Sequence, residues 1–179
     1  AHSVYPSVFV LFAEYQYRWN EQEVSWVLAA VGVFRVIVQA GLVGRVVPKL
    51  GERRTLLFGL ACGVVGFFIY GIADVGWVFL IGLPISALWG LAGPATQALI
   101  TQQVGADVQG RVQGALMSLV SLAGIVGPMM IAATFALFIG QSAPAHVPGA
   151  PWLLAAVLLA IGWLVGWRFA RPPHAATAG

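Results

Sequence analysis

Long uncharged stretches are the feature of this chain that most constrains its fold. Residues 55–73, 75–106 and 112–167 contain no charged side chain, and residues 24–44 contain only Arg35. A helix that crosses a bilayer needs about 20 consecutive apolar residues. Charged residues make up 8% of the chain, whereas soluble domains carry about 25%. The helices of a soluble bundle would need charged outer faces, which are missing here. The sequence therefore predicts an all-α membrane protein.

Charges and turn-forming residues divide the chain into expected helices. The segment QSAPAHVPGAP, residues 141–151, is rich in proline and small residues and predicts a loop. Five full membrane helices are expected, at about 22–46, 55–74, 77–103, 109–139 and 151–168. Residues 1–16 carry an apolar stretch that ends at Glu14, too short to span a bilayer. We interpret them as a truncated first helix, which brings the number of helices to six. The chain is then a piece of a longer chain.

Basic residues predict which side of the membrane each loop occupies. Seven of them fall on one side: Arg45, Lys49, Arg53, Arg54, Arg111, Arg168 and Arg171. The opposite side carries Arg18 among Glu14, Glu21 and Glu23, and then Asp74. The GERR segment and the C-terminal tail, residues 169–179, are therefore expected in the cytoplasm.

The expected helices differ in polarity. Helices 55–74 and 151–168 contain almost nothing polar and are expected to face lipid. The other full helices each carry small or polar residues at a spacing that places them on one face. These are Ser25, Gly32, Arg35 and Gln39 in helix 22–46, Ser86, Gly90, Gly93 and Gln97 in helix 77–103, and Gly110, Gly114, Ser118 and Ser121 in helix 109–139. Small residues let membrane helices pack closely, which is the favoured interpretation of the glycines and serines. Ser118 and Ser121 are also candidate cavity-lining residues.

Amides gain little from packing, so Gln39 and Gln97 are interpreted as part of a pathway. Trp89 lies one turn before Gly93, where its ring either stacks on a ligand or fills space. Pro94 and Pro128 are expected to kink their helices. Such kinks free backbone carbonyls near the bilayer midplane, where transporters often bind their substrates.

Arg35 is the sharpest single feature. It is the twelfth residue of the 24–44 run, near the expected bilayer centre, where an arginine costs at least about 2.5–3.5 kcal/mol. One explanation is a structural ion pair, but the apolar spans contain no acidic residue. The partner must come from Glu14, from a missing part of the protein or from a ligand. We expect Arg35 to face a central cavity.

The segment GRVVPKLGERR, residues 44–54, is a basic link between two helices. Gly44 and Gly51 would permit its turn, and Lys49, Arg53 and Arg54 carry its charge. Charge alone is explained by the preference of basic loops for the cytoplasm. The spacing, however, resembles the G-x-x-x-D-R-x-G-R-R loop of the major facilitator superfamily. Pro48 and Glu52 stand at its aspartate position and at one arginine position.

Other stretches strengthen this resemblance. FAEYQYRWNEQEV and GPATQALITQQVGADVQGRVQGALMSLVSLAGIVGP resemble the C-terminal half of the tetracycline/proton antiporter group of that superfamily. The resemblance implies a twelve-helix exporter in a bacterial inner membrane, of which this chain is one six-helix half. It implies alternating access, with a drug exchanged for protons. The usual substrate is tetracycline chelated to a divalent cation such as magnesium.

The resemblance also exposes two departures. Arg35 stands where the group commonly has a histidine, and arginine does not titrate near neutral pH. Gly63 stands where the group has a membrane aspartate. Gln39 matches a glutamine of the group. Arg35 is therefore expected to tune a carboxylate in the absent N-terminal half, or to contact an acidic part of the substrate.

Enzymatic activity is not expected. His2, His146 and His174 are scattered without metal-ligand spacing, and no phosphate-binding loop for ATP is present. No bound cofactor and no nucleic-acid partner are expected, and the partners are a small drug, protons, lipid and the missing half. Two alternatives remain open: a major facilitator transporter of another substrate, and a six-helix membrane module that dimerises or does not transport.

Overall fold

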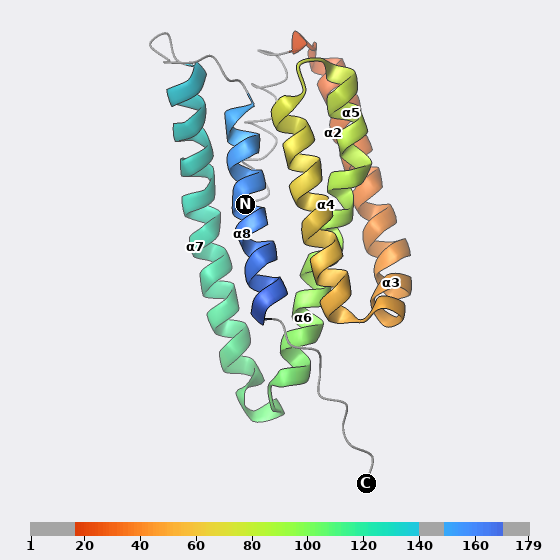
Figure 1. Ribbon diagram of the computed structural model, residues 1–179, viewed down its shortest axis with the longest axis vertical. Coiled ribbons are helices and arrows are strands. Elements are labelled where there is room, and N and C mark those ends of the chain that lie inside the picture. Colours follow the sequence, from red (N-terminus) through yellow and green to blue (C-terminus); the bar gives the residue numbers. More distant parts are fainter. Residues whose placement is uncertain (1–16, 140–148, 170–179) are drawn as a thin grey trace.

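The computed structural model describes residues 17–139 and 149–169, and these form helices joined by short turns, without a strand. The elements, in chain order, are α2 (Glu21–Val36), η1 (Ile37–Leu42), α3 (Val43–Leu50), α4 (Glu52–Ile72), α5 (Gly76–Ala87), η2 (Leu88–Leu91), α6 (Ala92–Gln103), α7 (Ala106–Ile139) and α8 (Ala150–Phe169). They stand roughly side by side in one bundle, with α7 at its edge (Figure 1).

The described residues contain five helical spans long and apolar enough to cross a membrane: Glu21–Leu50, Glu52–Ile72, Gly76–Gln102, Val108–Phe138 and Ala150–Phe169. The all-α fold and the five full helices predicted from the uncharged runs are confirmed, and the chain is a multi-pass membrane protein. The predicted helix at 1–16 lies outside the described residues, as does the predicted tail at 169–179 apart from Phe169. Most of the predicted loop at 141–151 also lies outside them.

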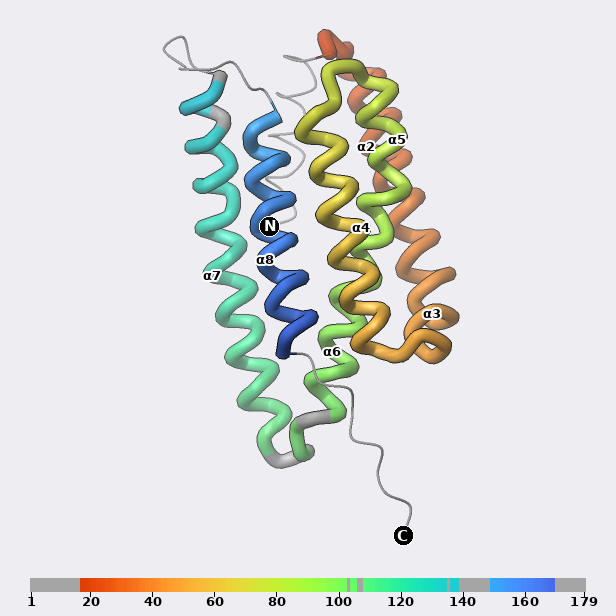
Figure 2. Tube along the Cα trace, in the orientation of Figure 1, coloured from red at the N-terminus to blue at the C-terminus, as the bar shows by residue number. Residues whose placement is uncertain are grey.

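The first span is one continuous rod built from α2, η1 and α3 (Figure 2). It begins with a capping box, in which Asn20 and Glu23 each accept a 2.9 Å hydrogen bond from the other's backbone N–H. Its middle, η1, is a π-helix, in which the turn is wider than in an α-helix. The rod continues to Leu50, four residues beyond the predicted end.

The predicted loop at 44–54 is wrong in extent. Gly44, Pro48 and Lys49 lie in α3, and only Gly51 separates it from α4. Pro48 lies inside α3, where its fixed φ is compatible with a helix but its missing N–H removes one hydrogen bond, and the helix ends two residues later. Gly51 ends the helix because its φ of 78° lies in the left-handed region that glycine adopts readily.

Helix α4 is the centre of the bundle and packs against α3, α5, α6 and α8. Its buried face carries glycines that permit close approach: a Cβ at Gly66 would lie 2.7 Å from the Cβ of Ser86. Its opposite face exposes Phe58, Val65 and Phe68. The prediction that this helix faces lipid therefore describes one face only.

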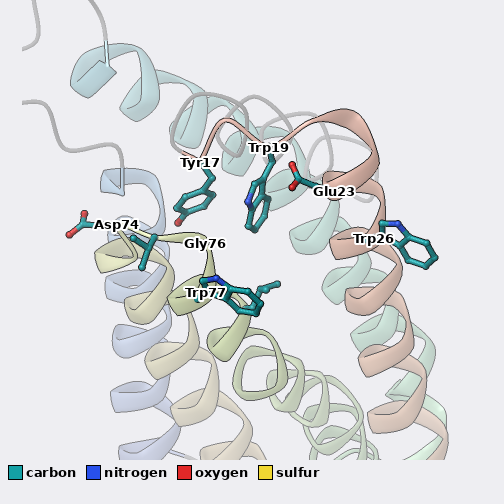
Figure 3. A pocket seen from close by; sticks show the side chains of 9 residues that line it. Tyr17, Trp19, Glu23, Trp26, Asp74, Gly76 and Trp77 are labelled. Atoms are coloured by element: carbon teal, nitrogen blue, oxygen red, sulfur yellow. The ribbon is translucent and has the colours of Figure 1, made fainter.

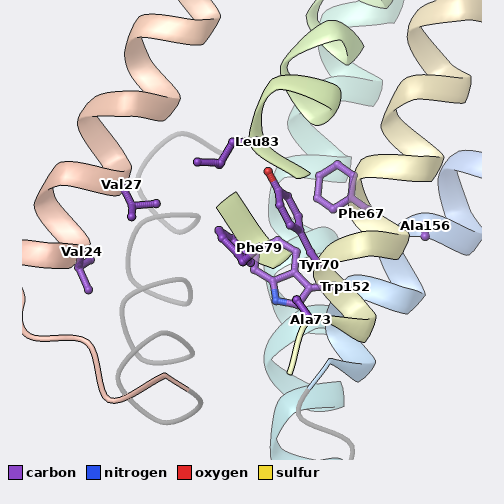
Figure 4. Packing of buried hydrophobic residues seen from close by; sticks show 9 residues of the cluster. All are labelled: Val24, Val27, Phe67, Tyr70, Ala73, Phe79, Leu83, Trp152 and Ala156. Carbon is purple, nitrogen blue, oxygen red and sulfur yellow. The ribbon is translucent and has the colours of Figure 1, made fainter. Parts of the chain in front are cut away.

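An aromatic cluster fixes one end of the bundle (Figure 4). The rings of Tyr70 and Phe79 stack with centroids 4.2 Å apart, and Trp152 of α8 packs edge-on against Tyr70. The Tyr70 hydroxyl lies 2.6 Å from the Ser86 hydroxyl. Burying large aromatic side chains stabilises the packing of α4, α5 and α8.

Candidate functional site

Arg35 lies at the centre of the first span, fourteen residues from Glu21 and fifteen from Leu50. Its side chain is exposed, and it makes no hydrogen bond or ion pair with any residue that the structure describes. A cation at the middle of an apolar span needs water, an acidic partner or an anionic ligand. No residue in the described part of the chain supplies that acidic partner, and Glu14 lies outside the described residues.

The π-helix η1 begins two residues after Arg35 and contains Gln39, which is exposed. π-Helical turns are rare and occur frequently at functional sites. They widen the helix and rotate the residues that follow. The sequence analysis missed this element, since no proline marks residues 37–42 and the apolar pattern continues through them.

A second irregular segment packs against η1. It is the 3₁₀-helix η2, which joins α5 to α6. Val38 of η1 and Leu91 of η2 are buried. Pro94 follows in the first turn of α6, where it leaves the Gly90 carbonyl without its usual N–H partner. The 3₁₀ segment ends three residues before Pro94, and the kink expected at Pro94 stays a prediction.

Trp89 lies in η2 and is 37% exposed. Its indole packs edge-on against Phe67, with ring centroids 5.6 Å apart. Gly63 lies beneath it: a Cβ on Gly63 would be 3.1 Å from the indole. Packing against Phe67 and Gly63 therefore accounts for one side of the Trp89 indole, and the exposed part of the ring is accessible to a ligand. The glycine at position 63 is what makes room for the ring.

The amide of Gln97 on α6 is bonded to α7. Gln113 Nε2 donates a 2.9 Å hydrogen bond to Gln97 Oε1. Gln113 was missed by the sequence analysis, although glutamines in apolar helices are the signal that identified Gln97. Ser118 donates to the Gly114 carbonyl within α7, and Ser121 is exposed. Both serines therefore lie on the exposed surface of α7.

Pro128 lies within α7, which continues as one α-helix from Ala106 to Ile139. The helix α7 therefore continues through Pro128, where a kink is expected from the sequence.

The turn at Gly51 is tied to two other helices. Arg53 Nη2 donates a 2.8 Å hydrogen bond to the Trp167 carbonyl, in the last turn of α8. Gln102 of α6 donates a 2.8 Å hydrogen bond to the carboxylate of Glu52. Arg54 is exposed and makes no hydrogen bond with a described residue. The two arginines of the predicted motif therefore have different surroundings.

A hollow of about 540 Å³ lies at the other end of the bundle, where α2 begins and α4 leads into α5 (Figure 3). We call it the aromatic hollow; its walls include Tyr17, Trp19, Glu23, Trp26, Asp74 and Trp77. The Tyr17 hydroxyl donates to the Ala73 carbonyl at 2.7 Å, and burial, with a smaller effect of Asp74, raises the pKa of Tyr17. The sequence analysis missed this hollow, which contains none of the predicted site residues.

The predicted residues are not gathered into one enclosed site within this chain. Arg35, Gln39 and Gln97 are exposed on the spans that begin with α2 and α5. Among the described residues, no group of three histidine, cysteine, aspartate or glutamate side chains could hold a metal.

Comparison with known proteins identifies the family. The family model described as Major Facilitator Superfamily matches residues 1–178. The chain is 36% identical over 155 residues to "Tetracycline resistance protein, class G" of Vibrio anguillarum, covering 87% of this chain and 38% of that protein. It is 32% identical to "Tetracycline resistance protein, class H" of Pasteurella multocida, with the same coverage.

A more distant relative is "Hippocampus abundant transcript-like protein 1" of Rattus norvegicus, at 24% identity over 89% of this chain and 34% of that protein. No solved structure matches the chain significantly. The chain spans about two fifths of the length of the tetracycline resistance proteins it matches. The resemblance noted in the sequence is thus confirmed, and the chain belongs to the major facilitator superfamily.

Proposed function

We propose that this chain is the C-terminal half of a secondary transporter that exports a tetracycline-like drug in exchange for protons. The observation that carries the proposal is the position of Arg35. Its side chain is exposed at the centre of a membrane span and forms no ion pair or hydrogen bond with a residue that the structure describes. The names of the tetracycline resistance proteins support the substrate class. The superfamily consists of transporters rather than enzymes.

Arg35 acts as a fixed positive charge in this proposal. A guanidinium stays protonated throughout the physiological range, so it does not carry the transported proton. It lowers the pKa of a carboxylate in the N-terminal half, or it binds an acidic oxygen of the drug. Tetracycline travels as a chelate with a divalent cation such as Mg²⁺, which is part of the cargo.

The remaining contacts in this proposal come from the other predicted site residues. Gln39 lies one turn further along, and Gln97 offers its amide from α6. Trp89 offers the exposed part of an indole for stacking on a ring system. Ser118 and Ser121 contribute hydroxyls from α7. These residues line a cavity closed by the missing half.

Alternating access is a rocking of this bundle against the N-terminal half. The Gly51 turn, held to α8 by Arg53, moves with this half, while the exposed Arg54 and Lys49 contact the other half. The adjoining irregular segments η1 and η2 absorb the bending near the substrate. The Gly51 turn and the C-terminus face the cytoplasm of a bacterial cell, as the basic residues predict.

Proton-driven tetracycline uptake into inverted membrane vesicles tests this function. The complete transporter is compared with its Arg35→Gln variant and with Arg45→Gln as a control. Arg45 is an exposed arginine nearer the end of the same span, bonded to the Gly41 carbonyl at 3.1 Å. Uptake by the parent and the control, with loss in Arg35→Gln at equal protein levels, supports the proposal. Uptake of other compounds but not of tetracycline refutes the substrate class.

A further inference from the structure

Aromatic rings surround the aromatic hollow and leave much of their surface uncovered. Trp26 and Trp77 are 71% and 78% exposed. Trp19 lies against Gly76, where any Cβ would collide with its indole. Indole faces carry negative electrostatic potential and attract cations that lie over them. The walls therefore favour a ligand that is both positively charged and partly apolar.

A carboxylate is already positioned among these rings. Glu23 points toward Trp19 across the hollow, while Asp74 lies at the rim with its carboxylate turned outward (Figure 3). Glu23 Oε2 is held by the backbone N–H of Asn20 at 2.9 Å. No described residue donates to Glu23 Oε1. The capping box thus fixes a charged oxygen that can accept a further donor.

None of the described residues that line the hollow is basic, so no lysine or arginine among them neutralises this charge. Arg18 is the nearest arginine in sequence, but it is exposed and does not line the hollow. Glu23 and Asp74 are too few ligands for a metal site, since Ca²⁺ takes six to eight oxygens. A volume of about 540 Å³ instead suits a charged group with several carbon atoms.

The lining residues also share one depth in the membrane. Each lies within five residues of Glu21 or Gly76, where two spans begin. Tryptophan at such positions is typical of the membrane–water interface, where lipid headgroups lie. We propose that the aromatic hollow binds an organic ammonium group, with Glu23 as its hydrogen-bond acceptor and the indoles of Trp19, Trp26 and Trp77 around it. The source of this group is an ethanolamine lipid headgroup or a free organic cation.

The test measures binding rather than transport, so its outcome is independent of the proposed function. The complete protein is equilibrated with equal amounts of phosphatidylethanolamine and phosphatidylglycerol, and retained lipids are counted by native mass spectrometry. Free ethylammonium, whose N–H groups can donate to Glu23, is titrated separately and followed by tryptophan fluorescence. Glu23→Gln removes the charge but keeps the capping box, since glutamine also serves at this position. Trp77→Leu removes a ring, and Trp167→Leu, an exposed indole near the end of α8, is the matched control.

Preferential retention of phosphatidylethanolamine, reduced about fivefold in Glu23→Gln and Trp77→Leu but not in Trp167→Leu, supports the site with a lipid ligand. Saturable ethylammonium binding, weakened by the same two variants, supports it with a free cation. Equal retention of the two lipids together with no saturable cation binding overturns the proposal. It is also overturned if both variants lower the retention of the two lipids by the same factor, because the residues then have only a structural role.

Discussion

Gln113 of α7 donates a 2.9 Å hydrogen bond to the side-chain oxygen of Gln97 on α6. The two amides lie on helices that are joined at the end of the bundle where Gly51 lies (Figure 1). The bond uses the acceptor of Gln97 and leaves its NH₂ group for another partner. It therefore orients Gln97 while linking α7 to the rest of the bundle.

Removing either amide is expected to have nearly the same effect as removing both. Gln97→Leu and Gln113→Leu should each lower the free energy of unfolding by about 0.5–1.5 kcal/mol, the usual net value of a hydrogen bond. The double variant should be hardly less stable than either single one, because the bond is lost only once. Thermal unfolding of the purified protein in detergent measures this coupling. Additive losses in the double variant would show that the amides act separately.

Gly63 is expected to tolerate no side chain while Trp89 is present. Gly63→Ala places a Cβ 3.1 Å from the indole, and Gly63→Asp adds a charge there. Overpacking of this kind costs about 1–3 kcal/mol of unfolding free energy. Gly162→Ala is the control, because a Cβ at Gly162 meets nothing within 4 Å. Gly63→Ala should cost less in a Trp89→Ala background, where the indole is gone, than in the parent. A melting temperature unchanged by Gly63→Ala would contradict the close contact.

Arg53 and Arg54 are expected to have separable effects. Arg53→Gln loses the hydrogen bond to the Trp167 carbonyl at the C-terminal end of α8, where a positive charge is favourable. It should lower unfolding free energy by about 1–2 kcal/mol. Arg54→Gln should leave stability within about 0.5 kcal/mol, because its side chain is exposed.

The same pair tests the contact with the other half. Export measured in vesicles should fall in Arg54→Gln although its melting temperature is unchanged. Unaltered export by the variant that neutralises both arginines would refute the role of this turn in alternating access.

Tyr17 should make stability depend on pH in the alkaline range. Burial, together with Asp74, raises its pKa above the ordinary value of 10.0, so the folded protein holds this proton more tightly than the unfolded chain. The resulting stabilisation is fully present below pH 10 and is lost as the pH rises from there toward the folded pKa. Tyr17→Phe should flatten that part of the curve, measured as melting temperature against pH. An identical slope in parent and variant would contradict the burial of the hydroxyl.

The sequence predicted the spans well because charges cannot be placed freely in an apolar helix. The uncharged run 55–73 corresponds closely to α4, and Arg35 emerged as exceptional for the same reason. Gly44 misled the prediction of the loop, since glycine is common in turns but here lies within α3. Only the backbone shows that Gly51 alone makes the turn.

Other features depend on contacts that a sequence pattern does not contain. The π-helix η1 packs against η2, and neither has a distinctive residue pattern. The pairing of Gln97 with Gln113 needs the relative position of α6 and α7. The aromatic hollow brings Trp19 together with Trp77 across two spans, although the sequence separates them by more than fifty residues.

Cysteine labelling of Arg35→Cys measures most directly whether this position faces a transport pathway. The complete transporter, in a background without other cysteines, including Cys62, is treated in membranes with a charged, membrane-impermeant maleimide. Lys49→Cys serves as the accessible control, and Phe68→Cys, on the exposed apolar face of α4, as the lipid-facing control. The account predicts that, without tetracycline, Arg35→Cys is labelled nearly as fast as Lys49→Cys. Labelling as slow as that of Phe68→Cys, with and without the drug, would contradict it.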